Sequence, residues 1–151
     1  MLAATSCQIR WVDYSTCQAA IRQIRDRVFI QEQQIDPELE FDGLDPHAQH
    51  ALADYHHQAV GTLRLRAIAP ETLKLERLAV LPPYRGQGIG RQLVQAAIAQ
   101  AQHHHYHQIV LHSQQYIVPL YAQLGFQIQG EPFVEANIPH VKMTYEFKVQ
   151  S

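Results

Sequence analysis

The chain has 151 residues, of which 46% are hydrophobic, and its formal net charge is −2 with neutral histidines. This length and apolar content predict one globular domain covering residues 1–151. So small a net charge produces too weak an electrostatic field to predict binding to nucleic acid or to a membrane surface. Because no run of about 18 apolar residues occurs, no membrane-spanning helix is expected.

The two cysteines, Cys7 and Cys17, are too few for a disulfide framework. Neither lies in a cationic turn that would activate a thiol, so both are predicted to be reduced and partly buried. Residues Met1–Ser6 lack the basic segment and apolar core of a signal peptide. Together these features predict a cytoplasmic protein.

The first elements in chain order are a strand, a long helix and a polar loop. Gln8–Asp13 alternates as a strand does, and Ser15 or Thr16 can cap a helix that runs to about Gln31. The loop that follows, Asp36–Pro46, is broken by prolines. It carries five acidic residues: Asp36, Glu38, Glu40, Asp42 and Asp45.

A hairpin comes next, with strands over 50–55 and 58–67 joined at His56-His57, and then a strand over 73–80. After a glycine-rich turn, a helix is predicted to about Gln102. The remaining elements are a buried strand at 109–111, a helix over 116–124 that ends at Gly125, strands over 126–130 and 140–147, and a loop over 131–139. The pattern predicts a mixed sheet flanked by helices.

The turn between the strand over 73–80 and the next helix is the most informative stretch. It follows Pro82 and Pro83 and holds three glycines in five positions: Gly86, Gly88 and Gly90. Glycines let the backbone approach a ligand closely, and the first N–H groups of a helix have no internal partner. With Arg85 and Arg91 on either side, the turn predicts a site for a polyanion such as a pyrophosphate.

The glycine spacing fits neither the G-x-G-x-x-G nor the P-loop pattern. Arg85, Gly88 and Gly90 instead resemble R/Q-x-x-G-x-G/A, the coenzyme A motif of the GNAT acetyltransferases. Gln114–Phe126 resembles a second GNAT pattern, N-x-x-A-x-x-F-Y-x-x-x-G-F. The matching residues are Tyr121, Gly125 and Phe126, while Gln114 replaces Asn and Leu120 replaces Phe. Segments 27–34, 40–45 and 130–143 resemble the small stand-alone bacterial branch of ElaA- and YjcF-like members.

The resemblance implies a GNAT α/β (α+β) fold, a mixed and mostly antiparallel sheet of about seven strands with about four helices, splayed at the acetyl-CoA site. It implies acetyl-CoA as co-substrate, with the pyrophosphate in the glycine turn. Backbone groups at the end of the strand over 73–80 would hold the pantetheine arm and the oxyanion. The implied binding residues are Leu78, Ala79, Val80, Arg85, Gly86, Gln87, Gly88, Ile89, Gly90, Arg91, Gln114 and Tyr121.

By the same resemblance, Tyr121 is the general acid for the CoA thiolate, or else only a packed aromatic residue. For the general base we weigh Glu76, His140 and, as a third choice, His50. Alternation places Glu76 on the face of Lys74, Leu78 and Val80 unless a bulge intervenes, and a half-buried carboxylate there would have a raised pKa. The alternative for Glu76 is an ion pair with Arg77, Arg64 or Arg66.

The acceptor is less defined. The acidic loop over 38–45 can attract a cationic amine, or it can be a solvated loop whose acids form caps and turns. Arg64 and Arg66 can equally bind an acidic acceptor. His103 and His107 lie one helical turn apart, but His103, His104, His105 and His107 sit at a helix end with no acidic or cysteine ligand nearby, so no metal is expected.

Two functions remain open on these grounds. One is an acetyl-CoA-dependent N-acetyltransferase acting on a primary amine of a small molecule or peptide by direct attack. The other is a CoA-binding sensor or interaction module without turnover. A homodimer is the expected assembly, because small GNAT proteins often pair.

Overall fold

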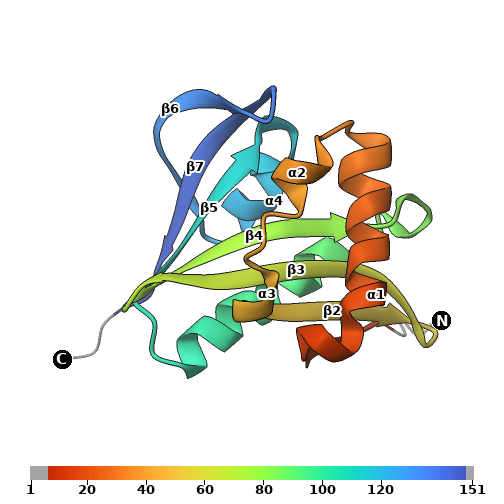
Figure 1. The fold of residues 1–151 in the computed structure, drawn as a ribbon. Coiled ribbons are helices and arrows are strands. Elements are labelled where there is room, and N and C mark those ends of the chain that lie inside the picture. Colours follow the sequence, from red (N-terminus) through yellow and green to blue (C-terminus); the bar gives the residue numbers. More distant parts are fainter. Residues whose placement is uncertain (1–6, 149–151) are drawn as a thin grey trace.

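Seven strands form one sheet in the computed structural model, which describes residues 7–148 (Figure 1). The order across the sheet is β1-β2-β3-β4-β5-β7-β6, and only β4 and β5 pair in parallel. The strands are β1 (Cys7–Val12), β2 (Gln49–Tyr55), β3 (Gln58–Ala69), β4 (Thr72–Val80), β5 (Gln108–Gln114), β6 (Gln127–Glu135) and β7 (Ile138–Glu146). The predicted mixed, mostly antiparallel sheet is confirmed.

Helices cover both faces of the sheet (Figure 1). The helical elements are α1 (Tyr14–Arg25), the π-helical turn η1 (Asp26–Glu32), α2 (Pro37–Glu40), η2 (Asp45–His47), η3 (Pro82–Tyr84), α3 (Ile89–His103), η4 (Gln115–Ile117) and α4 (Val118–Gln123). On one face, Ile21, Ile24 and Val28 pack with Leu52. On the other, Leu93, Val94 and Ala97 of α3 pack on the buried residues of the sheet. The sheet therefore lies between two apolar cores and contributes side chains to both.

The cap of the first helix differs from the prediction. Asp13, not Ser15 or Thr16, precedes α1, and its carboxylate accepts hydrogen bonds from the hydroxyls of Ser15 at 2.6 Å and Thr16 at 3.0 Å. Those bonds lower the pKa of Asp13. The hairpin turn is confirmed, because His56 and His57 both adopt positive φ, as a type I′ turn requires.

The C-terminal hairpin also differs, since the predicted loop over 131–139 is mostly strand. β6 continues to Glu135, and the turn to β7 is only Ala136-Asn137, with φ of 51° and 62°. Gly130 (φ 80°) and Pro132 lie where the β6–β7 register shifts, and they suggested a loop. An edge strand tolerates both residues, because one side of it donates no ladder hydrogen bonds.

A β-bulge interrupts β4 at Arg77. Thr62 and Arg64 of β3, two residues apart, pair with Ala79 and Glu76 of β4, which are three residues apart. Arg77 takes up the extra residue with φ of 60°. The bulge reverses the alternation of side chains, so every residue after it points to the opposite face from the one that strict alternation predicts.

β4 and β5 separate three residues before the bulge. Their parallel pairing ends at Lys74 and Val110, although β4 runs on to Val80 and β5 to Gln114. The backbone of residues 75–80 therefore faces a gap in the sheet, and the predicted splay is confirmed.

Within residues 7–148, no helix is long and apolar enough to cross a membrane. Cys7 and Cys17 are free and partly buried, as predicted. The prediction about a leader at Met1–Ser6 concerns residues outside the described part of the chain.

Candidate active site

The gap between β4 and β5 opens into a cavity of about 400 Å³. Side chains of the N-terminal arm, of β4 and β5 and of the β6–β7 turn line it. Five residues singled out from the sequence meet there: Glu76, Leu78, Gln114, Tyr121 and His140. Gln114 also bridges the cavity, since its amide donates to the side-chain oxygen of Gln33 at 2.8 Å.

The glycine turn lies outside that cavity, at the start of α3. Gly86 and Gly88 have φ of 78° and 82°, a conformation that favours glycine, and Gly88 is the N-cap of the helix. The first backbone bond of α3 runs from Gln92 N to Gly88 O at 3.0 Å. The N–H groups of residues 89–91 thus have no partner inside the helix and can hold an anion.

The two arginines beside the turn are engaged within the protein. Arg85 donates to the carbonyl oxygen of Val80 at 2.9 Å and forms a two-pronged ion pair with Glu32 at 2.7 and 2.6 Å. Arg91 is exposed and donates to the side-chain oxygen of Gln123 at 3.4 Å. Arg85 therefore ties the end of η1 to the last residue of β4.

Tyr121 is 5% exposed and packs edge-on against Phe126, with ring centroids 5.5 Å apart. Burial raises the pKa of its hydroxyl far above the usual range. The hydroxyl is therefore held protonated, which is the form that a general acid needs.

Glu76 does not have the environment predicted for it. Because of the bulge at Arg77, it lies on the face opposite Leu78 and Val80, which pack into the α3 core. Its carboxylate contacts Arg66 at 2.9 Å, Arg64 at 3.0 Å and Lys74 at 3.7 Å. Burial alone would raise the pKa of this carboxyl, but these cations lower it overall, so the predicted raised pKa is wrong.

His140 presents one free nitrogen to the cavity. Its Nδ1 lies 2.7 Å from the carbonyl oxygen of Ile138, which only accepts, so Nδ1 carries the proton. Its Nε2 lies 3.8 Å from Glu135, and Glu135 in turn contacts His112 Nδ1 at 3.0 Å. Phe133 packs between the two imidazole rings. A neutral His140 thus offers Nε2 as a proton acceptor.

His50, the third candidate base, does not line the cavity. It is 1% exposed, stacks near Tyr14, and its Nε2 donates to the carbonyl oxygen of Asp45 at 2.9 Å. Burial lowers its pKa, so its position is that of a neutral core histidine.

The family model described as an acetyltransferase (GNAT) domain matches residues 13–147. The chain belongs to the GNAT acetyltransferases. It is therefore an acyltransferase, as the motif of the glycine turn and the motif that contains Tyr121 implied.

Individual relatives agree. The uncharacterized protein YyaT of Bacillus subtilis is 39% identical over 127 residues, which are 82% of this chain and 85% of that protein. The uncharacterized N-acetyltransferase YjcF of the same organism is 31% identical, covering 80% and 86%. The crystal structure of Escherichia coli ElaA has a TM-score of 0.83 and 25% identity, covering 93% and 99%. The predicted ElaA- and YjcF-like branch is confirmed.

A GNAT family acetyltransferase from Elizabethkingia anophelis, solved with acetyl-CoA bound, is similar in fold. Its TM-score is 0.70 at 22% identity, with 93% of this chain and 98% of that chain covered.

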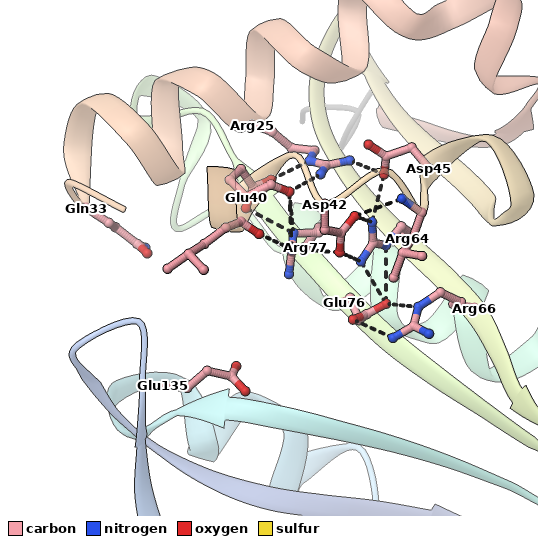
Figure 2. Close-up of polar contacts among 12 residues, drawn as sticks. Arg25, Gln33, Glu40, Asp42, Asp45, Arg64, Arg66, Glu76, Arg77 and Glu135 are labelled. Atoms are coloured by element: carbon pink, nitrogen blue, oxygen red, sulfur yellow. Dashed lines mark hydrogen bonds and ion pairs between the residues drawn. The ribbon is translucent and has the colours of Figure 1, made fainter. Parts of the chain in front are cut away.

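The acidic loop of this GNAT chain divides into two parts. Asp36 and Glu38 are exposed, and Asp36 caps α2 by accepting from the Glu38 N–H at 2.9 Å, as the capping alternative predicted. The carboxylates of Glu40, Asp42 and Asp45 point into a cluster of arginines (Figure 2). Glu40 pairs with Arg25 and Arg77, Asp45 with Arg25 and Arg64, and Asp42 with Arg64 and Arg77. We call this set, together with Glu76, the arginine–carboxylate cluster. Arg25 and Arg64 are fully buried, so Arg64 cannot contact an acceptor.

Sequence reasoning missed Glu135 and His112, which line the cavity beside His140. Glu135 fell in the segment predicted as a loop, and the pairing of β5 with β7 that brings His112 near it carries no local signal. The histidines at 103–107 are elsewhere, and no metal-binding group exists among the described residues.

Asp42 and Asp45 of the arginine–carboxylate cluster predict acid sensitivity, whereas burial raises the pKa of Glu40 in the same cluster. Burial opposes the effect, but Arg64 holds the pKa of Asp42 well below its usual range, and Arg25 and Arg64 lower that of Asp45. A carboxyl whose pKa is lower in the folded than in the unfolded state adds stability above its ordinary range, near pH 4. That stability is lost as the pH falls from this range toward the pKa of the folded state. We expect the free energy of unfolding, measured with urea, to hold above about pH 5 and to drop progressively as the pH falls below about 4.

Asp42→Asn should flatten that drop, because it removes one of the titrating groups. The control is Glu131→Gln, an exposed carboxylate with no ion pair among residues 7–148, which should leave the slope as it is. An unchanged slope in Asp42→Asn would contradict the assignment.

Proposed function

We propose that this chain transfers the acetyl group of acetyl-CoA to a primary amine of a small molecule or peptide, by direct attack of the amine on the thioester. One observation carries the proposal: an anion-binding helix start follows directly on a strand whose free edge opens into a cavity containing Tyr121 and His140. That order supports a phosphate site at the start of α3, close to a reaction centre along the free edge of β4.

The residues around the splay fit acetyl-CoA. The N–H groups at the start of α3, from Gly86 to Arg91, suit its pyrophosphate, with Arg85 and Arg91 nearby. The edge of β4 at Leu78, Ala79 and Val80, which β5 does not pair with, suits the pantetheine arm, which adds to the sheet like a short strand. The Val80 carbonyl on this strand already accepts from Arg85. Gln114 lies across the gap at the end of β5. The acetyl-CoA complex of the Elizabethkingia protein supports the same donor here.

In the proposed mechanism, Nε2 of His140 takes one proton from the acceptor ammonium group, directly or through water. The amine nitrogen attacks the thioester carbon, and backbone N–H groups near Leu78 stabilise the oxyanion. As the C–S bond breaks, Tyr121 protonates the thiolate, and the second proton of the nitrogen replaces the proton on Tyr121. The products are the N-acetyl amine, CoA thiol and one released proton.

We favour His140 over Glu76 as the base. Glu76 is held by three cations that stabilise its charged form and weaken it as a proton acceptor. His140 has one nitrogen fixed on the Ile138 carbonyl and the other facing the cavity.

An acceptor screen that follows release of free CoA thiol tests the proposal. Turnover with any primary amine, with the N-acetyl product identified by mass spectrometry, supports it. Tight acetyl-CoA binding without turnover across amino acids, polyamines, aminosugars and peptides would instead support the CoA-binding sensor.

We also propose that residues 1–151 form one domain that pairs as a homodimer in the cytoplasm. The continuous sheet from β1 to β7 supports one domain. The edge strand β6 carries Ile128 and Val134, which are 54% and 70% exposed and are suited to a partner. Sedimentation at micromolar concentration should give twice the chain mass of 17.3 kDa, and a 17.3 kDa species alone would exclude the dimer.

Gly88→Val should weaken acetyl-CoA binding by at least about tenfold, or 1.4 kcal/mol, because a β-branched residue resists the φ of 82° that shapes the turn. Gly90→Ala is the control: a methyl group there would lie 3.9 Å from Leu120 and Val80, and the helical backbone accepts it. Calorimetry on both folded proteins makes the comparison, and equal affinities would contradict the site.

Tyr121→Phe keeps the buried ring and removes the hydroxyl. If the hydroxyl protonates the thiolate, kcat should fall by about 10²-fold while acetyl-CoA affinity stays nearly constant. Steady-state kinetics and calorimetry on one preparation separate the two effects. A kcat close to that of the parent protein would leave Tyr121 a packing residue.

His140→Asn should lower kcat/KM at neutral pH, and the loss should shrink as pH rises, because the amine then arrives already deprotonated. Glu76→Gln should show no such recovery if Glu76 serves only the arginine–carboxylate cluster. The pH profiles of kcat/KM decide between them: recovery in Glu76→Gln and not in His140→Asn reverses the assignment.

A further inference from the structure

The charges that line the cavity are divided between two walls. The first wall is formed by β3, β4 and α2 and holds the arginine–carboxylate cluster. The second is formed by β5 and the β6–β7 turn and holds His112, Glu135 and His140. Figure 2 shows Glu135 across the gap from Glu76 and Arg66.

On the first wall, the carboxylates are already satisfied. Each of Glu40, Asp42 and Glu76 contacts at least two cationic side chains within 4.0 Å, and Glu40 and Glu76 are nearly buried. With Asp45, four carboxylates face five cations: Arg25, Arg64, Arg66, Lys74 and Arg77. This group therefore holds one more cation than acid, and the difference comes from Arg25, Arg64 and Asp45, which do not line the cavity.

Three cations of that wall and one of its acids keep exposed side chains. Arg66, Lys74 and Arg77 are 26%, 21% and 22% exposed, against 24% for Asp42 and 8% for Glu76. Lys74 is the least committed, because its ammonium lies 3.7 Å from Glu76, beyond hydrogen-bond distance. Lys74 can therefore donate to an anion without giving up a hydrogen bond to Glu76.

The second wall has the opposite character. Glu135 is 48% exposed, and among the described residues that line the cavity it is the one carboxylate without an arginine or lysine partner. Its contacts are the imidazoles of His112 at 3.0 Å and His140 at 3.8 Å. An ammonium group beside Glu135 would lie next to the Nε2 atom that we propose as the base.

We propose that the acceptor is an amine that also carries an oxyanion, a carboxylate or a phosphate. The oxyanion is held by Lys74 and Arg66, and the ammonium group by Glu135 beside His140. This inference rests on the proposed N-acetyltransferase function and narrows its substrate class. It disfavours polyamines, whose second cation would meet Lys74 and Arg66.

Binding measured by calorimetry tests the inference apart from turnover. The probes are pairs that differ by one anionic group: cadaverine with lysine, and ethanolamine with O-phosphoethanolamine. In at least one pair the anionic member should bind about tenfold more tightly or better, the scale of a charge-assisted contact. The pair that shows the preference identifies carboxylate or phosphate. The absence of a preference in both pairs overturns the inference.

Lys74→Gln should remove most of that preference by weakening the anionic member, and it should not weaken the member that lacks the anion. Lys142→Gln, an exposed lysine on β7 that does not line the cavity, should preserve the preference. A preference that survives Lys74→Gln, or one lost equally in both variants, contradicts the assignment.

Kinetics distinguish this failure from failure of the proposed function. If amines are acetylated with equal kcat/KM whether or not they carry an anion, the function stands and the acceptor class is wrong. If the preferred ligands bind but release no CoA thiol with acetyl-CoA present, the binding site stands and the enzyme assignment fails.

Discussion

The left-handed backbone of Arg77, in the middle of β4, determines most of what surrounds the cavity. It adds one residue to β4 against β3, and that extra residue puts Glu76 on one face and Leu78 on the other. A non-glycine residue in this conformation costs on the order of 1–3 kcal/mol. The contacts of its guanidinium, with Glu40 at 3.0 Å and the Leu39 carbonyl at 3.1 Å, offset that cost by fixing the side chain.

The arginine–carboxylate cluster joins the N-terminal arm to the sheet. Arg25 comes from α1, Arg64 from β3, and the acids between them from the loop that links those elements. Removing one partner from such a cluster leaves a buried charge without a counter-charge, which costs about 3–5 kcal/mol. The cluster therefore fixes both the position and the charge of the first cavity wall. A substitution in it would change the shape of the site and its electrostatics together.

The sequence predicted the parts of the site that depend on local pattern. Gly86, Gly88 and Tyr121 lie within short motifs whose spacing follows from one turn or one helix. The two glycines form a turn with positive φ and Tyr121 lies at the cavity, while their roles stay predictions. Glu76 and Glu135 could not be placed in this way. The face of Glu76 depends on a bulge set by contacts with residues about 37 positions away, and Glu135 depends on an edge strand whose glycine and proline suggested a loop.

The ion pair between Arg85 and Glu32 changes how the glycine turn meets a phosphate group. Three N–H donors of the guanidinium are bonded inside the protein, to Val80 and to both oxygens of Glu32, and a guanidinium has five. Its charge is already balanced before any ligand arrives. The turn then attracts an anion mainly through the backbone dipoles at the start of α3. Their field acts over a short range, so it does not attract simple inorganic anions from a distance. In the proposed binding mode, selectivity for a long, phosphate-bearing molecule over free phosphate follows from that restraint, because such a molecule gains the rest of its affinity along β4.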